Sequence, residues 1–322
     1  MILTHTVDPS LSGASLRHVL RQMGIGVQQT ALILKTDSVR VDGEFVYPNQ
    51  PVFEGEILEI SLPGFPPRDV VPVGTLPTPK VLYEDDAYLA VFKPSGVQTH
   101  PSKTARIGKE DSMEERVMSS LQCVAHPFHR LDAETQGILL FAKFPYAQVA
   151  LQEQLFKGGF RKQYEAYIFG TLPADTGIIE APIERKHSGS YTRIIREDGR
   201  PSTTTYAVLD IQSVEGHPVS HVLLSPMTGR THQLRVHMYY LHCPILGDPR
   251  YCTLPSTAFQ ETHMISDLQL NAFKLEFHHP FLNQKITISS NRLANPFWYS
   301  KSDSDISNQP QCEHTGSSRF LW

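Results

Sequence analysis

The chain has 322 residues, of which 40% are hydrophobic, so it can bury a sizeable core and we expect two domains. Its formal net charge of -4 excludes a protein that coats nucleic acid through bulk positive charge, although it allows a local basic cleft. The four cysteines show no close pairing, which predicts free thiols in a reducing compartment. No apolar run reaches the length of a membrane span and the start lacks a leader pattern, so we expect a cytoplasmic protein.

The first sixty residues predict a compact ααβββ module, which we assign to residues 1–62. Residues 15–24 carry apolar side chains at helical spacing, and residues 28–35 suit a second short helix. Two short strands flank Asp42-Gly43, a dipeptide that favours a tight hairpin turn, and residues 55–62 alternate apolar and polar side chains as a half-buried strand does.

Strands dominate after residues 63–80, a proline-rich stretch that we interpret as a linker. The clearest later helix is predicted at residues 145–159, which have a proline near the start and a glycine pair at the end. Another helix is expected at 229–242. Residues 81–298 thus predict an α+β domain with a mixed, mainly antiparallel sheet, and the polar residues 299–322 predict a disordered tail.

Asp132 is the first candidate for chemistry. It lies between "HPFHRL" and the apolar run "GILLFAK", which predicts a loop at the edge of the sheet, where functional residues are common. Aspartate also simply favours the start of a turn such as "DAETQG", so its position alone leaves both interpretations open.

Arginine and tyrosine side chains could act with this carboxylate. Arg230 and Arg235 lie in "GRTHQLR", and a planar guanidinium can hold one carboxylate oxygen while leaving the other free, although two helical arginines also suit a solvated face. Tyr164 and Tyr167 would lie on opposite faces of a strand, so one could stack on a planar base in a cleft while the other packs in the core.

A metal site is not expected. His232, His237 and His242 recur every five residues, a step that rotates successive side chains by about 140° on a helix, so the three would not share a face.

Four blocks then carry a resemblance to a known family. They are "VLYEDDAYLAVFKPSGVQTHPS", "HRLDAETQGILLFAK", "KQYEAYIFG" and "GRTHQLRVHMYYLHCPILGDPRY", and they resemble, in this order, the motifs of the RluA-type pseudouridine synthases. The likeness runs from about residue 80 to about residue 295. The N-terminal module is similar to the alpha-L RNA-binding domain, but it is divergent and acidic, with four basic against seven acidic side chains.

The resemblance implies a mixed eight-stranded sheet with Asp132 as the catalytic aspartate in a central cleft. Tyr164 would stack against the uracil, and Arg230 would pair with the aspartate, with Arg235 as the second choice for that role. The remaining implied substrate contacts are Arg130, which would lie beside the flipped base, Leu234 in the pocket wall, and His129.

The resemblance also implies the reaction, the isomerisation of uridine to pseudouridine in structured RNA, with no metal and no organic cofactor. Ribosomal RNA is the first expected substrate and transfer RNA the second. A catalytically silent RNA-binding protein acting in ribosome assembly is the alternative from another class. We expect a monomer that has no membrane partner.

Overall fold

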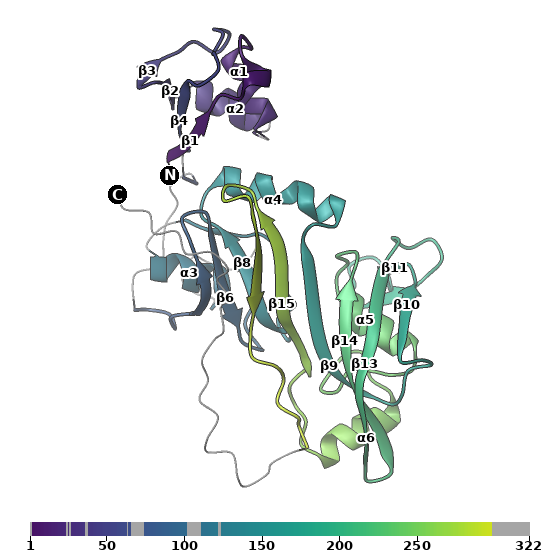
Figure 1. Ribbon diagram of the computed structural model, residues 1–322. Coiled ribbons are helices and arrows are strands. Elements are labelled where there is room, and N and C mark those ends of the chain that lie inside the picture. Colours follow the sequence, from purple (N-terminus) through teal and green to yellow (C-terminus); the bar gives the residue numbers. More distant parts are fainter. Residues whose placement is uncertain are drawn as a thin grey trace.

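The computed structural model of the chain describes residues 2–23, 25, 27–35, 38–62, 64–65, 74–101, 111–121 and 124–297 (Figure 1). The predicted disordered tail at residues 299–322 lies outside these residues, as do residues 63 and 66–73 of the predicted linker. No helix in these described ranges is long and apolar enough to cross a membrane.

The N-terminal sheet contains four antiparallel strands in the order β1-β4-β2-β3. They are β1 (Ile2–Thr6), β2 (Val39–Val41), β3 (Glu44–Phe45) and β4 (Ile57–Ser61), accompanied by the 3-10 turn η1 (Pro9–Leu11) and helices α1 (Leu16–Gln22) and α2 (Val27–Lys35). The predicted hairpin turn is present, because Asp42 and Gly43 both have positive φ angles, 48° and 81°. Strand β1 was not predicted from the sequence; it pairs with β4 at the side of the sheet.

The main sheet is mixed and mainly antiparallel, as predicted, and contains ten strands. Eight follow the order β10-β13-β14-β9-β15-β8-β6-β5, while β16 pairs with β15 and β7 with β8. Their bounds are β5 (Lys80–Glu84), β6 (Tyr88–Lys93), β7 (His126–Pro127), β8 (Gln136–Ala142), β9 (Arg161–Phe169), β10 (Thr176–Glu180), β13 (Thr203–Val214), β14 (His217–Pro226), β15 (Leu270–His279) and β16 (Gln284–Ser289). Of the pairings between these strands, only β15 with β8 is parallel.

Four helices and a small hairpin surround this sheet. They are α3 (Met113–Leu121), α4 (Pro145–Lys157), α5 (Gln233–Tyr240), α6 (Leu254–Thr262), and the pair β11 (Ile183–Arg185) and β12 (Arg193–Ile195). Helix α4 has the predicted ends, a proline in its first turn and a left-handed C-cap at Gly158. Figure 1 shows α5 beside the strands at the β10 end of the sheet and α4 at its upper end.

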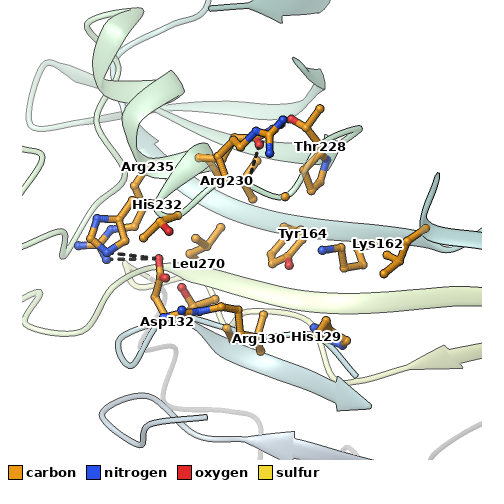
Figure 2. Close-up of a pocket in the computed structure, with 18 of the residues that line it drawn as sticks. His129, Arg130, Asp132, Lys162, Tyr164, Thr228, Arg230, His232, Arg235 and Leu270 are labelled. Atoms are coloured by element: carbon orange, nitrogen blue, oxygen red, sulfur yellow. Dashed lines mark hydrogen bonds and ion pairs between the residues drawn. The ribbon is translucent and has the colours of Figure 1, made fainter. Parts of the chain in front are cut away.

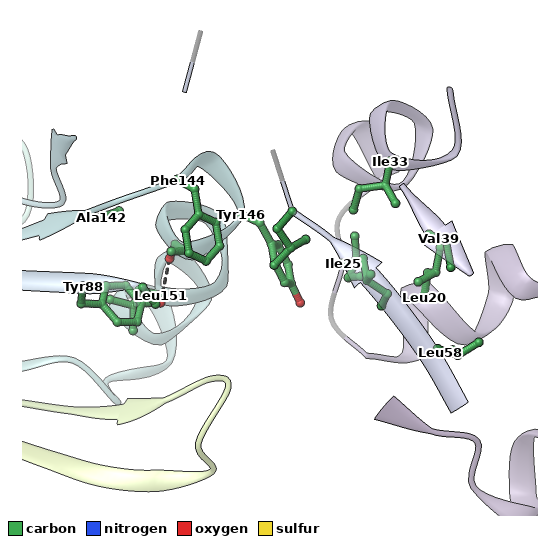
Figure 3. Packing of buried hydrophobic residues seen from close by; sticks show 14 of the residues in the cluster. Leu20, Ile25, Ile33, Val39, Leu58, Tyr88, Ala142, Phe144, Tyr146 and Leu151 are labelled. Carbon is green, nitrogen blue, oxygen red and sulfur yellow. Dashed lines mark hydrogen bonds between the residues drawn. The ribbon is translucent and has the colours of Figure 1, made fainter. Parts of the chain in front are cut away.

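The N-terminal module packs against the main domain around Tyr146 of α4 (Figure 3). The Tyr146 hydroxyl donates a hydrogen bond to the Met23 carbonyl at 3.3 Å. Leu20 and Ile25 belong to the same continuous buried cluster as Tyr146 and Tyr88. Burial of apolar surface between the two modules therefore contributes to their attachment.

The parallel contact between β8 and β15 lies near the middle of the main sheet. Gly137 at the start of β8 has a φ of 121°, and a Cβ atom there would lie 2.4 Å from the Ala272 carbonyl oxygen. Only glycine allows this approach of the two backbones. The loop that carries Asp132 enters the sheet here, before an interior strand and not at the edge that the sequence suggested.

Candidate active site

A cavity of about 280 Å³ opens where the loop before β8, strand β9 and the segment leading into α5 meet (Figure 2). It is lined by all seven of the side chains predicted to carry the site, namely His129, Arg130, Asp132, Tyr164, Arg230, Leu234 and Arg235. Its volume is near the low end of ligand pockets, which suits one small planar group.

Arg235 is the arginine that lies against Asp132. Its Nη1 is 3.6 Å from Asp132 Oδ2 and 3.2 Å from Glu134 Oε2, while Nε and Nη2 bind Asp248 at 2.7 and 2.8 Å. Burial acts to lower the pKa of Arg235, but its hydrogen bonds to Asp248 and the charges of the three carboxylates outweigh burial and raise the pKa. The Arg235 side chain is 1% exposed. Its two hydrogen bonds to Asp248 fix the orientation of the guanidinium that faces Asp132.

The prediction that Arg230 pairs with Asp132 is wrong. Arg230 donates from Nε to the Pro201 carbonyl at 3.1 Å, away from the carboxylate. The reason is the start of α5, which begins only at Gln233, because His232 adopts a left-handed conformation with φ 57°. Arg230 thus lies on the turn before the helix, while Arg235 lies within the helix and faces Asp132 (Figure 2).

His232 is the second neighbour of Asp132, with Nε2 4.0 Å from Oδ2. The Arg193 backbone N–H donates to the Tyr251 hydroxyl oxygen at 2.8 Å, and that hydroxyl lies 2.8 Å from His232 Nδ1. Because the hydroxyl oxygen already accepts from Arg193, its own hydrogen suits Nδ1, and the imidazole proton then lies on Nε2, toward Asp132. Burial first, and then the charges of nearby arginines, lower the pKa of His232 and favour this neutral ring.

Tyr164 forms the wall beside Asp132. Its side chain is buried, and burial together with the Asp132 charge raises its pKa, so the phenol stays protonated. Tyr167 lies on the opposite face of β9, as predicted, and stacks on His221 with ring centroids 4.5 Å apart. Leu234 is buried in the same core cluster as Tyr164, whereas Arg130 is exposed at the cavity.

The histidines that recur every five residues do not gather. His237 binds the Thr204 hydroxyl through Nδ1 and the Ala181 carbonyl through Nε2, at 2.9 and 3.0 Å. Among the residues that the structure describes, no group of three or more histidine, cysteine or acidic side chains could hold a metal ion.

Comparisons with known proteins identify the family. The sequence pattern of the RNA pseudouridylate synthase family matches residues 87–240. The chain is 30% identical over 296 residues to the ribosomal large subunit pseudouridine synthase C of Haemophilus ducreyi, covering 88% of this chain and 90% of that protein. It is 32% identical over 275 residues to the ribosomal large subunit pseudouridine synthase D of Xanthomonas campestris pv. campestris, covering 80% and 78%. The chain belongs to the RluA-type family of RNA pseudouridine synthases. These enzymes are isomerases.

Other similar proteins agree with this assignment. The dual-specificity RNA pseudouridine synthase RluA of Vibrio vulnificus is 35% identical over 208 residues, covering 64% of this chain and 80% of that one. Among solved structures, the human RNA pseudouridylate synthase domain containing 1 has a TM-score of 0.56 and 26% identity, and covers 70% of this chain and 87% of its own. The human domain containing 4, with a TM-score of 0.52 and 23% identity, shares the fold.

In this pseudouridine synthase, Lys93 at the end of β6 and Thr99 in the segment after β6 hold the Asp132 loop in place. The fully buried Lys93 donates to three carbonyl oxygens, those of Pro94, Val97 and Ala133, at 2.9, 2.6 and 2.7 Å. The Thr99 hydroxyl donates to the Leu131 carbonyl at 2.8 Å. The Lys93 ammonium group thus links Ala133, the residue after Asp132, to the end of β6.

Replacing Lys93 by Met is expected to lower the free energy of unfolding by about 3 kcal/mol, because buried carbonyl groups lose their donor. Burial lowers the pKa of Lys93 to about 8, against its usual 10.5. Between these values the unfolded chain holds more protons than the folded one, so this group adds stability as pH rises. Denaturant titrations should therefore show the gap between wild type and Lys93→Met widening from pH 8 to 10. A constant gap would contradict the lowered pKa of Lys93.

Tyr251→Phe is expected to lower kcat by about tenfold while leaving the fold intact, because the His232 ring loses the group that fixes its tautomer. Tyr206→Phe is a matched control, since Tyr206 is a tyrosine at the edge of burial in another core cluster and, among the described residues, makes no hydrogen bond with His232. Single-turnover kinetics of both variants test this. Equal losses in both would show that Tyr251 acts only by packing.

Several residues at this site were missed from the sequence, notably Lys93, Asp248 and Tyr251. Asp248 and Tyr251 lie in "GDPRY", at the end of a block already quoted, and Lys93 begins "KPSG". For Lys93 and Asp248 the residue type carried the only signal, a charged side chain within an otherwise apolar or turn-forming stretch, and Tyr251 carried none. Contact with Asp132 through Arg235 or His232 cannot be inferred from spacing.

Proposed function

We propose that this chain converts uridine to pseudouridine in ribosomal RNA, with Asp132 as its catalytic carboxylate. The observation that carries the proposal is the state of that carboxylate. Its Oδ2 faces Arg235 and His232, while Oδ1 makes no hydrogen bond or ion pair with any described residue, in a cavity whose wall is Tyr164. The names of the relatives from Haemophilus ducreyi and Xanthomonas campestris support ribosomal RNA as the substrate.

The reaction breaks the bond from ribose to the ring nitrogen, turns the uracil over, and rejoins it through carbon five. A single charged carboxylate with one free oxygen suits its start, either by adding to the sugar or the ring or by taking a proton from the ribose. Arg235 faces Asp132 Oδ2 at 3.6 Å and orients this carboxylate. The protonated Tyr164 ring offers a flat surface against which the detached base can lie while it turns.

The RNA must bring its uridine into this cavity, so the base is swung out of the folded RNA at a cost of about a few kcal/mol. Arg130, exposed at the cavity, is suited to fill the space that the base leaves. The hairpin of β11 and β12 adds exposed basic side chains close to the α5 side of the site, among them Arg185, Lys186 and Arg200. Phosphate contacts there would hold the RNA.

The rest of the proposal concerns assembly and domains. Residues 1–62 form an alpha-L-like module whose acidic balance limits its phosphate contacts, so residues 81–298 hold most of the RNA. The enzyme works as a cytoplasmic monomer and needs no metal or organic cofactor, because Asp132, Tyr164 and Arg235 supply the charge and the surface that the reaction requires.

The test is to delete the gene and map pseudouridine across all cellular RNA, then to complement with wild type and with Asp132→Asn. One or a few ribosomal sites should vanish and return only with wild type. Loss of pseudouridine from transfer RNA instead would show that transfer RNA is the substrate. The deletion strain could keep all its pseudouridine sites, and the purified wild-type protein could also fail to modify total RNA from that strain. These two results together would show a catalytically silent RNA-binding protein.

A further inference from the structure

The end of the cavity away from Asp132 holds a second charged group, Lys162. It lies on β9 two residues before Tyr164, and alternate residues of a strand share a face, so both side chains line the same cavity. Figure 2 shows the amino end of Lys162 directed along the cavity toward Tyr164. The cavity therefore has a carboxylate at one end and an ammonium group at the other.

Lys162 differs from the neighbouring lysines in its partners. Within the described part of the chain, it makes no hydrogen bond or ion pair. Lys274, on the adjacent strand β15, binds Glu276 at 3.2 Å, and Lys93 is satisfied by three carbonyl oxygens. Burial alone lowers the pKa of Lys162 to about 8, so it is still mostly charged at neutral pH. A partly buried charge without a counter-charge lowers the stability of the fold unless a ligand supplies the counter-charge.

His129 adds a second unpaired donor in the same wall. The Leu140 backbone N–H donates to His129 Nε2 at 3.3 Å, which leaves the imidazole proton on Nδ1. This Nδ1 is buried and finds no acceptor among the described residues. Burial, and then the charge of Lys162, lower the pKa of His129 to about 3, so the ring is neutral and close to Lys162. Lys162 is therefore the donor that faces the cavity, and His129 places a neutral ring beside it.

We propose that Lys162 forms an anion subsite that binds one backbone phosphate next to the target uridine. The inference rests on the proposed function, because an RNA substrate brings a phosphate with every nucleotide that enters the cavity. A phosphate oxygen supplies the negative charge that Lys162 lacks. The uracil carbonyls are neutral and supply only the acceptor.

The first test needs no turnover. Lys162 is acylated with an amine-reactive ester and the product is quantified by mass spectrometry, with uridine, uridine 3'-phosphate or uridine 5'-phosphate present at the same millimolar concentration. At least one of the nucleotides should slow acylation of Lys162 several-fold while uridine does not, and Lys274 should react equally in all samples. Equal protection by uridine, or no protection by either nucleotide, would overturn the subsite.

The second test separates binding from chemistry. Lys162→Gln should raise the KM for RNA by about tenfold, the loss expected for one charge-assisted contact, with kcat within about twofold. Lys162→Arg should recover most of the KM, and Lys274→Gln is the matched control that should behave as wild type. A fall in kcat at unchanged KM would overturn a phosphate contact. Absence of turnover by wild type would contradict the proposed function, and the acylation result would still decide the subsite.

Discussion

Asp132→Asn is expected to reduce pseudouridine formation by on the order of 10⁴-fold or more, the scale of losses when a central catalytic group is removed. The amide keeps the shape of the carboxylate but can neither add to the sugar or ring nor take a proton. Single-turnover assays with wild type and variant on the same RNA measure the effect. RNA affinity should stay within a few-fold, because phosphate contacts dominate binding.

The stability of this variant separates a catalytic from a structural role. Asp132 is 16% exposed and its contact with Arg235 is long at 3.6 Å, while Arg235 keeps Asp248 and Glu134. The free energy of unfolding should therefore change by about 1 kcal/mol or less. Glu134→Gln is the matched control, since it also removes a carboxylate from Arg235. An equal loss of turnover in both variants would show that the charge near Arg235 matters and not Asp132 itself.

Periodicity predicted the framework that holds Asp132 but not all of its parts. Strands β6, β8, β9, β14 and β15 and helix α4 follow runs whose apolar spacing matches their burial. Helix α3 was missed, because Glu114 and Glu115 in its first turn are buried, which contradicts the usual polar face. Glu114 instead pairs with His100 and His126 at 3.1 and 3.0 Å, contacts that come from distant segments.

At the site, residue type was informative and local geometry was not. The sequence predicted Asp132 on a loop and Tyr164 on a strand, and both line the cavity. It extended the helix of α5 back to residue 229, and this error placed Arg230 on the helix with Arg235. His232, in a left-handed conformation, delays the start of that helix to Gln233, and nothing in a hydrophobic pattern signals a positive φ at His232. The choice of Arg230 before Arg235 came from the resemblance to the family motif, and the contacts of the two side chains reverse it.

Arg235→Met is expected to abolish turnover and to lower the free energy of unfolding by about 3 to 5 kcal/mol, because Asp248 is 0% exposed and would lose its counter-charge. Arg230→Met should change the free energy of unfolding by about 0.5 kcal/mol, since among the described residues the Arg230 side chain binds only the Pro201 carbonyl, at 3.1 Å. Denaturant titration and single-turnover assays of both variants measure the contrast. A larger loss of turnover in Arg230→Met than in Arg235→Met would restore the assignment made from the sequence.

A double variant separates the two roles of Arg235. Asp248→Asn in the Arg235→Met background removes the orphaned buried charge, so part of the lost stability should return. Turnover should not return, because Asp132 still lacks the guanidinium that holds its Oδ2. Recovery of both together would mean that Arg235 serves the fold alone. Recovery of stability without activity would mean that Asp248 positions Arg235 and that Arg235 positions the Asp132 carboxylate. Asp132 would then be the residue of the three that acts on the substrate.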